Sequence, residues 1–253
     1  MTNNSFLVDT HCHIDLYKNP AEVVRETERS GIYTIAVTNA PFVFKHTAEL
    51  VAGCRYVRAA AGLHPELVAT HGSQIEMLRP LLKQTRYVGE IGLDYTTADE
   101  NLRRKQREIF ERILGWCAEE EEDKILTIHS RRAAADVISM VGDSFQGAAI
   151  LHWFTGAAKE VERAAAYGMY FSVNPAMVSS SKGRSLISAM PVDRVLTESD
   201  GPFVKVSGRD CKPVNMSLVA AELAKLWNLS ARQVEGRVYE NFRSLLKGKA
   251  VAN

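Results

Sequence analysis

Short apolar, β-branched runs bounded by turn residues recur along the whole chain and alternate with longer amphipathic stretches. The short runs predict strands, and the longer stretches, in which apolar residues return every three or four positions, predict helices. The predicted strands span residues 6–9, 33–37, 56–60, 87–90, 125–128, 148–151, 169–173 and 194–198. The predicted helices span residues 21–30, 75–83, 101–121, 133–140, 158–167, 216–227 and 231–246. This repeated strand–helix alternation indicates a parallel sheet.

The number of strands and the length of the chain together predict how that sheet is arranged. Eight strands in 253 residues favour an α/β fold of the (β/α)8 TIM barrel type over an open doubly wound sheet. No Gly-x-Gly-x-x-Gly turn follows the first predicted strand, as a dinucleotide-binding open sheet would require. No Pro/Ser-rich linker divides the chain, so we expect residues 1–253 to form a single domain. On pattern alone, an open sheet stays the alternative.

Composition and charge narrow the class of protein. With 46% hydrophobic and 24% charged residues, the chain has the composition of a soluble globular protein. The polar residues 1–5 and the absence of a long apolar segment predict no signal peptide and no membrane partner, so we expect a cytoplasmic protein. The four cysteines are far apart and form no Cys-x-x-Cys pair, which argues against a disulfide framework. A net charge of +1 requires that any positive potential toward nucleic acid be local.

Side chains that can bind a metal collect at the carboxyl ends of the predicted strands, where barrels of this type place their active sites. They are His11, His13, Glu90, His129, His152 and Asp200. Residues two apart on a strand share a face, so both imidazoles of His11 and His13 can enter the barrel mouth. For an isolated pair, buried and hydrogen-bonded histidines would be an equally good interpretation. Their company at one rim favours a site for a divalent metal ion.

The carboxylates have distinct expected roles. Glu90 lies inside an apolar strand, where an unpaired carboxylate is costly, so it needs a cation; a structural salt bridge is the alternative. We expect Asp200 to be both a ligand and the base that takes a proton from water. Asp9 and Glu198 share the faces of His11 and Asp200, and we expect them to orient the ligands from behind. Asp94 is nearer the loop and is interpreted as either a site or a turn residue.

Basic residues on the same rim could bind an anionic substrate. His64, Arg131 and Arg132 are the predicted substrate-binding residues, with His64 donating to a phosphate or capping its loop. Further cations follow the last two predicted strands: Lys182, Arg184, Lys205, Arg209 and Lys212. A solvated surface charge is the alternative for each of them. Trp153 and Phe154 are candidates for stacking on a base, with core packing as the alternative.

Six motifs at these strand ends carry a resemblance that covers nearly the whole chain. They are Asp-Thr-His-Cys-His-Ile-Asp (9–15), Gly-Leu-His-Pro (62–65), Gly-Glu-Ile-Gly-Leu-Asp-Tyr (89–95), Ile-His-Ser-Arg (128–131), His-Trp-Phe-Thr-Gly (152–156) and Glu-Ser-Asp-Gly-Pro (198–202). In order and spacing they resemble the TatD-type deoxyribonucleases of the amidohydrolase superfamily. The resemblance implies metal-dependent hydrolysis of DNA and up to two divalent ions (Zn, Mg or Mn). One ion would lie near His11, His13 and Asp200, the other near His129 and His152, with Glu90 between them.

Three departures from the family pattern fall on the loops that would face a substrate. Glu66 replaces the usual second histidine after Gly-x-His-Pro, Arg132 replaces an acid, and the segment 174–183 is unlike the common form. An intact metal set with altered loops resembles a specialised branch, such as the TatD-like proteins of anti-phage gene clusters. That resemblance would imply protein partners in a defence complex.

Three functions fit this sequence. The first is a metal-dependent deoxyribonuclease. The second is an amidohydrolase that acts on a C–N or ester bond, such as an aminoacyl-tRNA deacylase or a lactonase; Glu90 stands where several of those enzymes carry a carboxylated lysine, which disfavours it. The third is a metal-binding, non-catalytic subunit that works by binding partner proteins.

Overall fold

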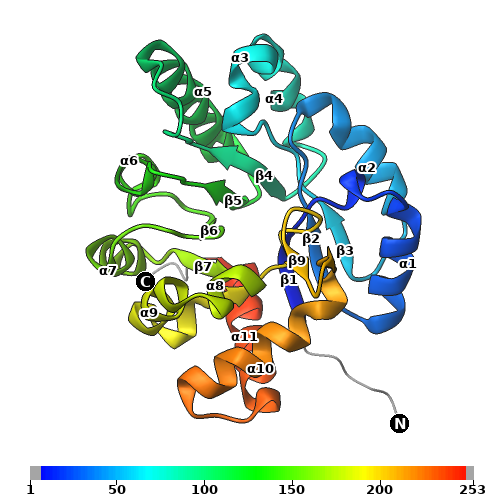
Figure 1. Ribbon diagram of the computed structural model, residues 1–253. Coiled ribbons are helices and arrows are strands. Elements are labelled where there is room, and N and C mark those ends of the chain that lie inside the picture. The colour runs from blue at the N-terminus through cyan, green and yellow to red at the C-terminus, as the bar shows by residue number, and fades with distance from the viewer. Residues whose placement is uncertain (1–6, 249–253) are drawn as a thin grey trace.

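Eight parallel strands surround a central axis, with helices packed around the outside, as the computed structural model of the chain shows for residues 7–248 (Figure 1). The strands are β1 (Val8–Cys12), β2 (Tyr33–Ala36), β3 (Val57–Ala59), β4 (Tyr87–Gly92), β5 (Ile125–His129), β6 (Ala148–Leu151), β7 (Tyr170–Val173) and β8 (Val195–Thr197). Backbone pairing gives one run of three strands, β1-β2-β3, and one of five, β4 to β8.

The two runs of strands join at both seams. Ala61, just after β3, forms a parallel bridge with Val88 of β4. At the other seam the Thr197 hydroxyl of β8 donates to the Val8 carbonyl of β1 at 2.5 Å, and the Asp200 amide donates to the His11 carbonyl at 2.9 Å. The (β/α)8 barrel predicted from the strand–helix alternation is therefore confirmed.

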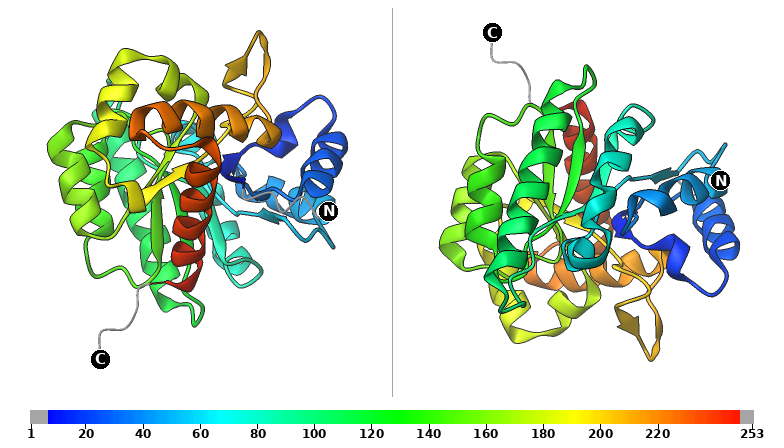
Figure 2. Two further views of the ribbon diagram at one scale, coloured as in Figure 1. Left: turned by 90° about the horizontal axis from the view of Figure 1, so that it is seen from below. Right: turned by 90° about the horizontal axis from the view of Figure 1, so that it is seen from above.

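The helices cover the barrel on all sides (Figure 2). They are α1 (Pro20–Ser30), α2 (Phe44–Leu50), α3 (Val68–His71), α4 (Leu78–Leu81), α5 (Glu100–Glu119), α6 (Ala134–Val141), α7 (Ala158–Ala166), α8 (Pro175–Ser179), α9 (Ser181–Ala189), α10 (Met216–Trp227) and α11 (Ala231–Lys247). Their ends follow local chemistry. In α1, for example, Asn19 accepts a hydrogen bond from the Glu22 amide, Pro20 begins the helix, and Gly31 ends it with φ +66°.

The strand predictions agree with the structure to within a few residues, and β1 and β4 run further than predicted, through Cys12 and Gly92. The first predicted strand began at residue 6, which lies outside the described residues. The helix predicted over 75–83 is mostly a 3-10 helix, Gly72–Met77, followed by the single turn α4, which contains Pro80.

The segment 174–183, expected as a loop, is helical. Asn174 accepts a hydrogen bond from the Met177 amide and begins α8, and Ser180 accepts one from the Gly183 amide and begins α9. A two-stranded hairpin, β9 (Lys205–Val206) with β10 (Arg209–Asp210), was also not predicted. Both additions follow strands at the end of the barrel where the candidate site lies.

Candidate metal centre

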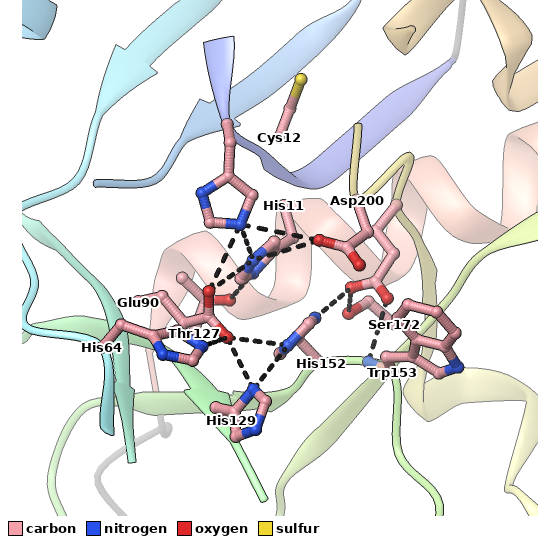
Figure 3. A network of polar contacts seen from close by, with 12 residues as sticks. His11, Cys12, His64, Glu90, Thr127, His129, His152, Trp153, Ser172 and Asp200 are labelled. Atoms are coloured by element: carbon pink, nitrogen blue, oxygen red, sulfur yellow. Dashed lines mark hydrogen bonds and ion pairs between the residues drawn. The ribbon is translucent and has the colours of Figure 1, made fainter. Parts of the chain in front are cut away.

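The carboxyl ends of five strands bring four histidines and two carboxylates into one buried cluster (Figure 3). His11 lies within β1 and His13 follows it; Glu90 lies in β4, His129 ends β5, His152 follows β6, and Asp200 follows β8. His11 is 0% exposed and Asp200 only 4%. Cys12 points away from the cluster, toward the Tyr17 hydroxyl. Strand alternation thus separates the two imidazoles of β1 from the thiol between them.

Glu90 is the centre of this cluster because its two oxygens face different histidines. Its Oε2 lies 3.4 Å from His11 Nε2 and 3.3 Å from His13 Nε2. Its Oε1 lies 2.8 Å from His129 Nδ1 and 3.0 Å from His152 Nε2. One carboxylate therefore stands between two pairs of imidazoles.

The first group of donors is formed by β1 and the segment after β8. His11 Nε2 and His13 Nε2 lie 3.2 Å apart, and Asp200 Oδ1 is 3.8 and 3.6 Å from them. The atoms of His11, His13 and Asp200 lie close enough together to share one metal ion. Glu90 Oε2 completes the group from the opposite side.

The second group is formed by β5 and the segment after β6. His129 Nδ1 lies 3.4 Å from His152 Nε2, and both face Glu90 Oε1. Two further sets of donors could also share an ion: His64 with Glu90 and His129, and His11 with His152 and Glu198. The second group is thus less sharply defined than the first.

Residues behind the cluster fix which ring nitrogen faces it. Thr127 Oγ1 lies 2.6 Å from His11 Nδ1, and Asp94 Oδ2 lies 2.7 Å from His129 Nε2. An aspartate can only accept, so His129 Nε2 carries the proton and Nδ1 offers its lone pair toward Glu90. A proton on His11 Nδ1, donated to Thr127, leaves Nε2 free in the same way. Such partners orient metal ligands and raise their basicity.

The two carboxylates expected to orient ligands make different contacts. Glu198 Oε2 lies 3.5 Å from His152 Nδ1, and Glu198 also accepts hydrogen bonds from Ser172, Asn174 and the Trp153 amide. Asp9 was expected to orient a histidine, and its Oδ1 accepts from the backbone amides of His11 and Ser199 and not from a ring nitrogen. Asp9 therefore holds the backbone of β1 beside that of β8, and the ring of His11 is oriented by Thr127.

His64, predicted to bind substrate, reaches the cluster from the loop after β3. Its Nδ1 accepts a hydrogen bond from the Glu66 amide at 3.1 Å, so its Nε2 carries the proton. That Nε2 lies 3.1 Å from Glu90 Oε1. In this tautomer His64 is a hydrogen-bond donor toward the centre and not a metal ligand.

The electrostatics of the cluster favour a cation. Burial alone would lower the pKa of His13, but hydrogen bonds with Asp200 and Glu90 raise it to about 9. Burial raises the pKa of Glu90, yet the neighbouring imidazoles, His64 first, hold it well below its usual range. Burial and the positive charge of His152 lower the pKa of His11 to about 3. The position between His13, Asp200 and Glu90 therefore attracts positive charge, while His11 stays a neutral nitrogen donor.

The chemistry of the donors shows that these residues fit a divalent ion. Buried imidazole nitrogens and carboxylate oxygens lie about 3 to 4 Å from one another. Most of these atoms are hydrogen-bond acceptors, and few protons are available to join them. Mixed nitrogen and oxygen donors suit Zn and Mn. Burying such a set without a cation would be costly.

Two glycines allow the backbone of Glu90 to lie where it does. A Cβ on Gly62 would lie 2.4 Å from the Glu90 amide nitrogen, and one on Gly89 would lie 2.1 Å from Thr127 Cγ2. A larger residue at position 62 would displace the backbone of β4, and one at position 89 would displace the Thr127 side chain. The close packing of Gly62 and of β5 against β4 therefore helps to fix where the Glu90 carboxylate is held.

A cavity of about 490 Å³ opens above the cluster. Its wall includes His64, Glu66, Arg131, Trp153 and Phe203. Phe203 is 59% exposed and its ring makes an edge contact with His13, with the ring centroids 5.0 Å apart. The cavity is the size of a small-molecule site, and it has both basic and aromatic walls.

The other predicted substrate contacts are distributed differently. Arg132 does not line this cavity but an adjoining groove, which Lys182 also lines. Lys205 pairs with Asp210 and Lys212 with Glu26, so these two lysines have partners on the surface. Phe154 is completely buried against Phe171 and is a core residue.

The sequence analysis left Asp94 open between a site and a turn residue, and it missed two residues that support the site. Thr127 has the same strand parity as His129, so the alternation of β5 held a signal for it. Gln106 of α5 had none. Its side chain accepts from the Asp94 amide at 3.0 Å and donates to the Pro65 carbonyl at 3.1 Å, linking the loops that follow β3 and β4.

A parallel barrel whose strand ends collect imidazoles and carboxylates around a shared glutamate defines a metal-dependent hydrolase. The chain belongs to the family of TatD related DNases, whose model matches residues 8–247. An uncharacterized metal-dependent hydrolase of Methanocaldococcus jannaschii is 27% identical over 92% of this chain and 94% of its own length. The human deoxyribonuclease TATDN3 is 22% identical over 90% of each chain.

The fold agrees with this assignment. The crystal structure of the TatD homologue YjjV from Escherichia coli superposes with a TM-score of 0.85 at 24% identity, covering 96% of this chain and 98% of that one. None of the helices within residues 7–248 has the length and apolar character needed to cross a membrane.

Proposed function

We propose that this metal-dependent hydrolase cleaves phosphodiester bonds in DNA. The observation that carries the proposal is Glu90, whose two oxygens face two separate pairs of histidines and so could bridge two ions. Pairs of divalent ions are used for in-line displacement at phosphorus. Membership of the TatD related DNase family and the similarity to the human deoxyribonuclease TATDN3 support the same substrate.

We propose the ligand sets that the resemblance implies. His11, His13 and Asp200 would hold one ion, His129 and His152 the other, and Glu90 would contact both. When bound, divalent ions would neutralise phosphate charge and lower the pKa of a water molecule. Zn, Mn and Mg are the ions to test.

The protein's own groups can supply the remaining steps. Asp200 lies at the edge of the cavity, where its carboxylate can accept a proton from the attacking water. The protonated Nε2 of His64 can donate to a phosphate oxygen, and the Arg131 guanidinium can pair with a second one. The exposed ring of Phe203 and the half-buried ring of Trp153 line the cavity and offer surfaces for a base.

The depth of the cluster bears on how DNA reaches it. The donors lie beneath the cavity rim, with His13 only 1% exposed. A nucleotide that is not held in a duplex can enter such a cavity, whereas stacked and paired bases keep a duplex outside it. We therefore expect cleavage at single-stranded or frayed ends.

A substrate panel tests the proposal. Metal-stripped protein is assayed on labelled single- and double-stranded DNA, RNA and acyl substrates, each with added Zn, Mn or Mg. We expect metal to restore DNA cleavage, with His129→Ala as the inactive control. Hydrolysis of the acyl substrates alone would replace the nuclease with an amidohydrolase, and inactivity on every substrate would favour a metal-binding subunit.

A further inference from the structure

A second hollow adjoins the metal cavity on the side of α6 and α7. It has a volume of about 600 Å³ and shares Ser130 and Thr155 with the cavity, so the two are continuous across these residues. Its wall comes from the loops after β4, β5 and β6 and from the start of α9. The helices α6, α7 and α9 lie next to one another along this side of the barrel (Figure 1). A linear substrate seated in the cavity can continue into this groove.

Consecutive arginines serve the two hollows. Arg131 lines the metal cavity, while Arg132 lines the groove. Arg132 has a left-handed backbone with φ +57°, which is unusual for a residue other than glycine. This conformation lets the chain turn at the rim, so that neighbouring side chains serve adjoining sites. Residues held in such conformations concentrate at functional sites.

The two cations of the groove have no ion-pair partner among the described residues, and its two carboxylates each accept a hydrogen bond from a neutral donor. Arg132 and Lys182 are exposed, and neither forms an ion pair with any residue between 7 and 248. The Asp136 carboxylate accepts a hydrogen bond from the Tyr95 hydroxyl, which in turn accepts from Arg107. The Glu160 carboxylate accepts from the Ala157 amide at the start of α7. The groove therefore offers two unpaired cations to an anionic ligand.

We propose that Arg132 and Lys182 form a phosphate-binding subsite that holds the DNA strand beyond the scissile bond. The proposal rests on the function proposed above and assigns the direction in which the strand leaves the cavity, over Ser130 and Thr155. A polyanion with regularly spaced phosphates fits two cations that lie outside the cavity of the reacting phosphate. The enzyme should accordingly bind an oligonucleotide more tightly than a dinucleotide.

Binding of fluorescent oligonucleotides tests the subsite. In the Asp200→Asn background, the affinities for dT12 and dT2 are measured by anisotropy between 50 and 200 mM salt. Two phosphate contacts to a single strand contribute about 1.4 to the slope of log affinity against log salt, or about a sevenfold loss over this range. Arg132→Gln with Lys182→Gln should remove that contribution for dT12 and leave dT2 binding nearly unchanged.

The matched control is Lys83→Gln with Arg232→Gln, which removes the same charge from two exposed residues outside the groove, one after α4 and one in α11. A parental affinity and salt slope for dT12 in the groove variant would overturn the subsite, as would an equal loss in the control. DNA cleavage by the unmutated enzyme is measured in parallel. If the unmutated enzyme cleaves DNA but the groove variant keeps the parental salt slope, only the subsite is rejected. If the slope changes in the groove variant but the unmutated enzyme does not cleave DNA, the nuclease is rejected and the groove remains a nucleic-acid site.

Discussion

Thr127 Oγ1 and His11 Nδ1, on opposite strands β5 and β1, lie 2.6 Å apart inside the barrel. The contact links the two strands across the barrel interior and holds the His11 ring with Nε2 toward Glu90. A ligand whose ring is held in this way does not have to be ordered when an ion binds.

Thr127→Val keeps the shape of the side chain and removes the oxygen, so it should weaken metal affinity by roughly 10- to 100-fold, the usual effect of losing a partner behind a ligand. Competition with a metal-binding dye measures this. Thr34→Val on β2 is the control, because Thr34 is equally buried but donates to the Ile32 carbonyl. Equal affinities for the Thr127 variant and the parent would show that the contact only packs the barrel.

His11→Ala with His13→Ala should abolish one ion site while the other remains, because His129 ends β5 and His152 follows β6, away from β1 in the chain. Elemental analysis of purified protein should show metal content falling by at least one ion for each fully loaded chain. Circular dichroism should stay that of the parent. A variant that is as metal-loaded as the parent would remove both histidines from the ligand set.

Asp200→Asn keeps the shape of the side chain and one oxygen near His11 and His13, but removes the negative charge and the basicity. Turnover of DNA under saturating metal should fall by roughly 10²- to 10⁴-fold, as is typical of the loss of a general base. Affinity for DNA should change far less, since the proposed phosphate contacts come from His64 and Arg131. Turnover close to that of the parent would exclude Asp200 from the mechanism.

Glu66 places a negative charge at the cavity mouth, 58% exposed and 4.0 Å from His64 Nδ1. Glu66→Gln removes the charge while the backbone amide still holds His64, so KM for DNA should fall by about two- to fivefold, the range expected of an exposed charge. The effect should shrink at high salt. The same KM in variant and parent at low salt would mean that the substrate does not pass this side of the mouth.

The fold could be predicted from the sequence because strands that are buried on both faces are written as short apolar runs, and turn residues mark where these runs end. Ala148–Leu151, for example, was predicted to its exact ends. Successive short helices were harder to predict. Asn174 and Ser180 begin α8 and α9, but these helices are so short that no amphipathic repeat develops in α8.

The residues of the candidate site could be predicted only where an imidazole or a carboxylate stands at the end of a predicted strand. His129 was predicted because it ends an apolar strand at the same rim as the other candidate ligands, whereas Asp94 was left open between a site and a turn residue. Its contact with His129 places Asp94 behind that ligand. Asp9 illustrates the converse. Its parity was read correctly, but side-chain parity does not say whether a carboxylate reaches a ring or a backbone amide.

Gln106 makes the loop of His64 and the loop of Asp94 a single mechanical unit. Its amide bonds one loop through Pro65 and the other through Asp94, from a long helix that packs outside the barrel. Neither loop can open alone without leaving a buried amide group unpaired, which costs about 1–3 kcal/mol. The two loops should therefore exchange their amide hydrogens with one common opening rate, and thermal loosening should reach the His64 and His129 sides of the centre together.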